Sequence, residues 1–172
     1  LTSSMLDKGT KNNSKHEISN QLESIGAEIS FVSSNRHINF TAHCLKSNID
    51  IVVRLIAEQL KEATFPEDEL LTLKKRMIAN LEVSKDDTKK QALINFLREI
   101  YPKGHYNRRS TIEDSINNIR SVQANDLIHF YEQAYGLGTL KIAAAGDISN
   151  DLFSGLIKTH FDGWGEQAVQ QL

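Results

Sequence analysis

A strict alternation of apolar and polar residues constrains the fold of this chain more than any other feature. In the stretch "RHINFTAHCL", one side of an extended chain carries Ile38, Phe40, Ala42 and Cys44, and the other carries His37, Asn39, Thr41 and His43. Period-two alternation is typical of a strand with one buried face. The β-rich stretch 27–33 precedes it, and Ser34-Asn35 between them predicts a tight turn. The chain should therefore contain an antiparallel hairpin that packs one face on a core.

The segments around the hairpin have the features of helices. Ser14 to Glu17 reads as a capping box, which predicts a helix over about 14–25, closed by Gly26. After the hairpin, Ser47 is expected to cap a helix over about 48–62.

A third helix should begin at "FPEDEL", where Pro66 suits the first helical position and three acids follow. No strong breaker occurs before Pro102, so we expect one long helix of ~30 residues, bent near Asp86-Asp87. Its apolar positions at helical spacing predict a buried stripe of Leu70, Leu73, Met77 and Leu81.

The last third of the chain predicts two short helices over about 112–118 and 124–135. A strand at "TLKIAAAGDI" and a helix over about 152–160 should follow them. The fold class is therefore α+β, with a mostly antiparallel sheet packed against several helices. We expect a single domain over 1–163 and an exit linker over 164–172.

Three strands are few for so many helices, so we expect the N-terminal strands of the sheet to be absent from the chain. The sheet edge left bare should be covered by a neighbouring chain or by residues outside 1–172.

Composition excludes several function classes. The net charge is −2 with both signs scattered, so nothing points to nucleic acid or to an anionic membrane surface. No apolar run reaches the ~18 residues of a membrane-spanning helix. Cys44 is the single cysteine, which rules out a disulfide within the chain, and we expect it to be a buried, inert thiol.

The residues alone reveal no catalytic constellation. His37 and His43 share a strand face about 20 Å apart, too far to bind one metal ion. The chain contains no H-E-x-x-H, no G-x-S-x-G and no phosphate-binding glycine loop.

The order of several motifs adds more. "MLDKGTKNNSKHEISNQLESIGAEIS" resembles a signature of the pitrilysin/insulinase metallopeptidases, the family of the mitochondrial processing peptidase, in which M-L-x-x-G-T-x-x-x-S precedes a helix. "FPEDELLTLKKRMIANLEVSKDD" resembles the long helix of that family. "GHYNRRSTIEDSINNI" and "LIHFYEQAYGLGTLKIAAAGDI" resemble its later loop and its helix–strand segment. The resemblance implies a metallohydrolase fold of the processing-peptidase type.

Active members of the family carry H-x-x-E-H directly before M-L-x-x-G-T, and a further glutamate in the long helix. By the resemblance, the general base falls on Ser3, the second zinc-binding histidine on Ser4, and the third ligand on or next to Asn80. Serine is a poor zinc ligand and cannot serve as the base near neutral pH, and asparagine carries no charge. The resemblance thus implies neither a metal site nor a catalytic residue in this chain.

The leading hypothesis is a non-catalytic domain of such a zinc peptidase, which forms half of a peptide-enclosing chamber and helps to bind the peptide substrate. The expected partner is a catalytic half that carries H-x-x-E-H, either fused or separate, or a second copy of the chain in a homodimer. Zinc and the activity are expected only in the catalytic half. The alternative is a stand-alone binding or scaffold subunit of the same fold. A third hypothesis is an active enzyme whose zinc ligands align elsewhere in the chain. The absence of any H-x-x-E-H from the sequence argues against it. For localisation we expect a soluble bacterial protein, cytoplasmic or periplasmic.

Overall fold

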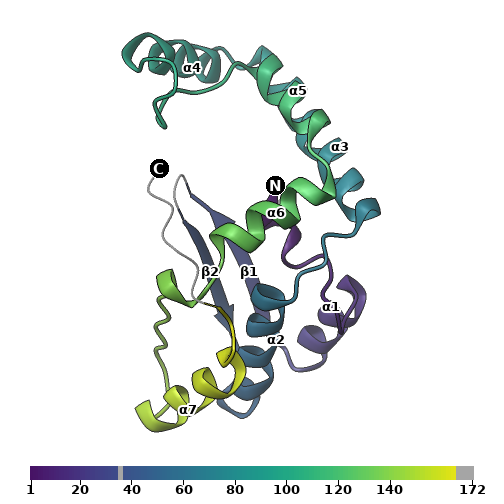
Figure 1. Cartoon of the computed structure of the whole chain (residues 1–172), viewed down its shortest axis with the longest axis vertical. Coiled ribbons are helices and arrows are strands. Elements are labelled where there is room, and N and C mark those ends of the chain that lie inside the picture. Colours follow the sequence, from purple (N-terminus) through teal and green to yellow (C-terminus); the bar gives the residue numbers. More distant parts are fainter. Residues whose placement is uncertain (35–36, 166–172) are drawn as a thin grey trace. The chain divides into compact units, whose positions relative to one another are not determined.

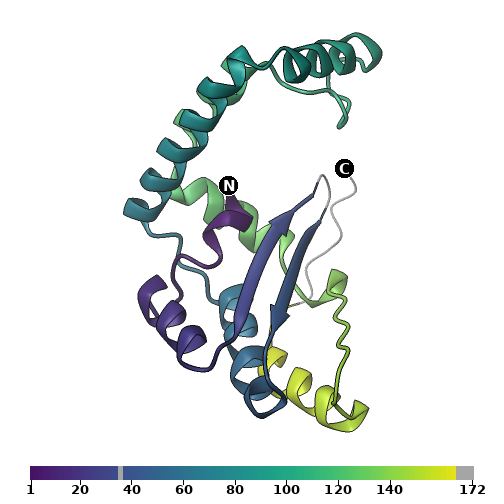
Figure 2. The same ribbon diagram turned by 180° about the vertical axis from the view of Figure 1, so that it is seen from behind.

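A computed structural model describes residues 1–34 and 37–165 (Figures 1 and 2). The chain divides into two compact units, which are described separately. The first unit comprises Leu1–Pro66 and the segment from Ala124 onward, and the second comprises Glu67–Gln123. The single domain over 1–163 stays a prediction, and residues 166–172 of the expected exit linker lie outside the described residues.

The predicted hairpin is confirmed in the first unit. Strand β1 (Glu28–Ser33) pairs antiparallel with β2 (Ile38–His43), with Phe31 opposite Phe40. The shared face carries the side chains of Ile29, Phe31, Ile38, Phe40 and Ala42, all half-buried. The turn predicted at Ser34-Asn35 falls partly outside the described residues, which omit residues 35 and 36.

Helix α2 (Ile49–Lys61) supplies much of the core of the first unit. Its buried apolar side chains are Val52, Val53, Leu55, Ile56, Ala57 and Leu60. The expected cap at Ser47 is wrong. The 3-10 helix η2 (Lys46–Asn48) leads into α2, and this extra turn places Asn48 at the cap position. The Asn48 side chain donates to the Ile25 carbonyl instead, at 3.2 Å.

Helix α1 (Lys15–Ser24) begins at the predicted capping box. The Glu17 carboxylate accepts the Ser14 backbone N–H at 2.7 Å, and the Ser14 hydroxyl accepts the Glu17 N–H. Ile18 is its buried residue.

The single long helix expected in the second unit is wrong. Helix α3 (Glu67–Val83) and the short 3-10 helix η3 (Ser84–Asp86) are separated from α4 (Thr88–Ile100) by Asp87. Asp87 has extended backbone angles, φ −82° and ψ 97°, and its side chain accepts the Lys90 N–H. Because the Asp87 side chain caps the first turn of α4, a new helix begins at this residue and the preceding helix ends before it.

Part of the stripe predicted for α3 is buried. Leu70 and Leu73 are buried, whereas Met77 and Leu81 are only half-buried. Helix α5 (Ile112–Ser121) packs against α3.

The first unit is completed by α6 (Ala124–Ala134), η4 (Leu137–Thr139) and α7 (Asn150–Phe161), of which α7 packs against α2.

The strand predicted at "TLKIAAAGDI" is wrong. Residues 140–149 lie outside any helix or strand, because a strand needs a hydrogen-bonded neighbour and the described residues supply none. The α+β class itself is confirmed. No helix among the described residues is both long and apolar enough to cross a membrane.

Candidate functional site

Ser3 and Ser4 lie next to each other in the 3-10 helix η1 (Thr2–Met5) of the first unit. The Ser3 residue is 5% exposed, and Ser4 is half-buried. The Ser4 N–H donates to the Leu1 carbonyl at 2.9 Å. Within the described part of the chain, neither hydroxyl has a hydrogen-bond partner, so neither serine is tied to a polar neighbour that would activate it.

Two fully buried side chains hold η1 in place. Met5 and Leu6 are 0% exposed, and η1 packs against β1 and α6. The "ML" of the N-terminal motif therefore contributes to the core.

Asn80 lies on α3, in the second unit, and its side chain is exposed. Its backbone carbonyl accepts the Ser84 hydroxyl at 2.7 Å, near the end of the helix. The structure therefore brings Ser3 and Ser4 together on one element and places Asn80 on an element of the other unit.

The donor set at these positions does not fit zinc. Zinc in proteins is bound by thiolate, imidazole nitrogen or carboxylate oxygen, and these positions offer two neutral hydroxyls and one amide. Among residues 1–34 and 37–165, no three His, Cys, Asp or Glu side chains are grouped so that they could hold a metal ion.

A polar network lies directly after η1, and sequence reasoning missed it. Glu58 on α2 accepts the Thr10 hydroxyl and the Asn13 side-chain amide, the latter at 2.7 Å. The Asn13 side-chain oxygen accepts from Gln21 at 2.7 Å, and the Gln21 side-chain oxygen accepts from Arg54 at 2.9 Å. Arg54 returns to Glu58 as an ion pair at 3.4 Å. The network thus joins the loop after η1 to α1 and α2.

Backbone contacts reinforce the same attachment. The Lys11 N–H donates to the Glu62 carbonyl at 3.0 Å, and the Thr64 N–H donates to the Gly9 carbonyl at 3.1 Å. Gly9 has φ +153°, and a Cβ atom there would lie 3.3 Å from Pro66 Cγ. The "GT" of the motif is therefore required by a close approach and a hydrogen-bond network.

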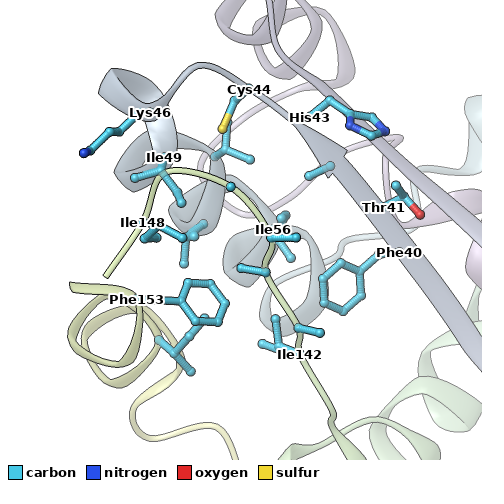
Figure 3. A pocket seen from close by; sticks show the side chains of 18 of the residues that line it. Phe40, Thr41, His43, Cys44, Lys46, Ile49, Ile56, Ile142, Ile148 and Phe153 are labelled. Carbon is cyan, nitrogen blue, oxygen red and sulfur yellow. The ribbon is translucent and has the colours of Figure 1, made fainter. Parts of the chain in front are cut away.

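A cavity of about 440 Å³ lies elsewhere in the first unit (Figure 3). It is bounded by β2, α2, α7 and the segment 142–148. The side chains of Phe40, Ile56, Ile142 and Phe153 converge on it. Cys44 lines it too and is half-buried rather than buried, with burial raising the pKa of its thiol.

Comparison with known sequences finds similarity to one family. The family model described as Insulinase (Peptidase family M16) matches residues 1–115. Subunit 1 of the bovine cytochrome b-c1 complex is 25% identical over 170 residues, which are 96% of this chain and 35% of that protein. The human mitochondrial-processing peptidase subunit beta is 24% identical over 159 residues, 91% of this chain and 32% of that protein. The chain thus spans about a third of the length of these curated relatives.

Solved structures share the fold. The inactive domain of a peptidase M16 from Pseudomonas fluorescens superposes with a TM-score of 0.80 at 22% identity, over 92% of this chain and 39% of that one. A protease from Helicobacter pylori gives a TM-score of 0.76 at 18% identity, over 99% of this chain and 41% of that one. The periplasmic protease of Escherichia coli gives 0.77 at 20% identity, over 97% of this chain and 19% of that one.

Proposed function

The chain belongs to the insulinase family, peptidase family M16, and on that premise we propose that it is a non-catalytic domain of a zinc peptidase. In this proposal it forms half of a chamber that encloses a peptide, and it helps to bind that peptide. Zinc and the hydrolytic chemistry belong to a partner half that carries H-x-x-E-H.

The observation that carries the proposal is the chemistry of η1. Ser3 and Ser4 occupy the positions that the resemblance assigns to the catalytic base and a zinc ligand, and η1 is buried by the packing of Met5 and Leu6. A serine hydroxyl cannot take a proton from water near pH 7. No step of peptide hydrolysis is therefore assigned to this chain.

The other residues of the M-L-x-x-G-T motif have roles in the fold, and they support the proposal that the fold is kept without the catalytic residues. Met5 and Leu6 fill the core, Gly9 permits the close approach to Pro66, and Thr10 bonds to Glu58. These are structural roles, and they explain why the motif can stand without the catalytic residues. Similarity to a domain described as inactive in a Pseudomonas fluorescens peptidase agrees with this reading.

A second candidate function is a scaffold subunit with no peptidase partner. The similarity to subunit 1 of the cytochrome b-c1 complex favours it, because that relative is by its name a subunit of a larger complex. In that case the same fold contributes an interaction surface and encloses no substrate.

Purification of the full-length protein from its native host, followed by identification of bound proteins, separates the two functions. We expect a stoichiometric partner, or a second half of the same polypeptide, that contains H-x-x-E-H. Mixing that partner with the chain should lower the KM of its peptide hydrolysis. Association only with subunits that lack H-x-x-E-H would reject the chamber and support the scaffold.

A further inference from the structure

The apolar side of α4 is uncovered in the part of the chain that the structure describes. Leu93, Phe96 and Ile100 form one stripe along the helix, because residues three, four or seven positions apart share a helix face. Their exposed fractions are 56%, 59% and 53%, and no residue of α4 is buried. A helix of 13 residues is only marginally stable in water unless an apolar face packs on something. This α4 stripe is therefore a surface that a partner would stabilise.

The opposite side of α4 is attached to the loop that follows the helix. The Arg98 guanidinium donates to the Arg109 carbonyl at 3.2 Å, and the Arg108 guanidinium donates to the Tyr101 carbonyl at 2.5 Å. At about 100° per residue, Arg98 lies on the far side of the helix from Phe96. These contacts hold α4 by one side and leave the stripe open among the described residues.

The two ends of the α4 stripe carry opposite charges. Lys89 lies on the stripe one turn before Leu93, and Glu99 lies beside its end at Ile100. Both charged residues are exposed, and neither has an ion-pair partner among the described residues. Glu99 comes ten positions after Lys89, about 15 Å further along the helix axis. The two charges are thus too far apart to pair with each other, and each can pair with an opposite charge on another molecule.

A second copy of α4 in the antiparallel orientation complements the stripe. When Leu93 of one copy lies opposite Phe96 of the other, Lys89 lies opposite Ile100 and next to Glu99. A two-fold axis repeats every contact, so two apolar contacts and two charge pairs form together. A parallel pair would instead place Lys89 against Lys89, and parallel helix dipoles repel.

We propose that α4 is a self-association surface, on which two copies of this chain pack antiparallel through the α4 stripe, with Lys89 of each copy paired with Glu99 of the other. One face of a single helix is a small interface, and interfaces that bury less than about 1,200 Å² in total belong mostly to weak, transient complexes. We therefore expect a reversible dimer. This inference does not rest on the proposed function.

Charge reversal tests the pairing. Sedimentation equilibrium measures the dissociation constant of the chain 1–172 and of its variants Lys89→Glu and Glu99→Lys. Each variant alone has like charges in both symmetric pairs, so we expect its dimer to dissociate at least ~10-fold more readily than wild type. An equimolar mixture should associate about as tightly as wild type, because every pair in the mixed dimer again joins a glutamate to a lysine. Both substitutions suit the dipole of α4, so neither should unfold it.

A second pair of variants tests the apolar contact. Phe96→Ser removes the largest side chain of the stripe, and we expect it to raise the dissociation constant at least ~10-fold. Leu71→Ser is the matched control, because Leu71 is 53% exposed on α3 and lies outside the stripe. That variant should associate like wild type, and circular dichroism should show unchanged helical content for both.

Four results would overturn the proposal. The wild-type chain could stay monomeric up to millimolar concentration, or the mixture could associate no more tightly than each charge variant alone. A dimer that Phe96→Ser does not weaken would be built on another surface. A monomeric chain that co-sediments with vesicles of phosphatidylcholine and phosphatidylserine would assign the stripe to a lipid surface. Since none of these measurements involves zinc, hydrolysis or a catalytic half, they leave the proposed function untouched.

Discussion

At the scale of residues, Thr10 shows how one hydroxyl fastens a loop to a helix. It bonds to Glu58, and its oxygen also accepts the Asn13 N–H at 3.0 Å. We expect Thr10→Val, which keeps the shape and removes the oxygen, to lower the free energy of unfolding by about 1–3 kcal/mol. Urea denaturation measures this. Thr10→Ser keeps the hydroxyl and should stay closer to wild type, and an unchanged valine variant would refute the role of the network.

Gly9 gives a second prediction at this scale. Gly9→Ala adds a Cβ atom 3.3 Å from Pro66 Cγ at φ +153°, where side chains are strained, so we expect a lower melting temperature. Gly155→Ala is the matched control, because Gly155 lies within α7 and a Cβ there meets nothing within 4 Å. That variant should gain about 0.5–1 kcal/mol from helix propensity. A Gly9→Ala variant as stable as wild type would contradict the close approach.

Single residues also show which roles can be predicted from the sequence and which cannot. Ser14, Glu17 and Gly26 act through neighbours a few positions away, and local patterns predicted their roles correctly. Thr10 and Glu58 are 48 positions apart, and no local pattern indicates that they meet. The Gly9-Thr10 pair of the N-terminal motif was the available sequence signal for this contact. Its structural role is explained only by the folded structure.

At the scale of elements, the stability that the capping box gives to the start of α1 should depend on pH. Hydrogen bonds from the backbone N–H and the hydroxyl of Ser14 lower the pKa of Glu17 below its ordinary value of 4.5. A lowered pKa in the folded state means that the stabilisation is complete above pH 4.5 and is lost as pH falls through the folded value. Urea denaturation at a series of pH values should show a smaller acid loss for Glu17→Gln than for wild type. Identical pH profiles would contradict this assignment.

The break between α3 and α4 gives another prediction. Asp87→Ala removes the cap of α4, so we expect a loss of about 0.5–2 kcal/mol, as for other N-caps. Faster hydrogen exchange in the first turn of α4 would report it. Asp86→Ala is the control, because the Asp86 side chain caps no helix in the described structure. Equal exchange in both variants would show that Asp87 does not begin the helix.

The elements that the sequence predicted well are those with a local cause. The hairpin follows from alternation, and α1 follows from its capping box and closing glycine. The strand expected at 139–148 failed because pairing depends on a neighbour, which a local pattern cannot supply. The prediction of one long helix was wrong because Asp87 caps a new helix at the place where a bend was expected. The sequence around Asp86-Asp87 is compatible with either a bend or a helix end.

At the scale of the whole chain, the pattern of predicted helices and strands gave the α+β class, and the order of motifs along the chain predicted the family. The family match over residues 1–115 and the shared fold confirm both. The roles of Ser3, Ser4 and Asn80 stay predictions, because they rest on positional correspondence with active relatives.

Zinc content, measured together with peptidase activity, tests the central claim most directly. The chain 1–172 is equilibrated with excess zinc, dialysed against metal-free buffer and analysed by mass spectrometry for bound zinc, while hydrolysis of unfolded fluorogenic peptides is followed in parallel. We predict well under one zinc per chain and no hydrolysis above buffer, with Ser3→Ala and Ser4→Ala indistinguishable from wild type. One zinc per chain, with hydrolysis that a chelator abolishes, would contradict the account.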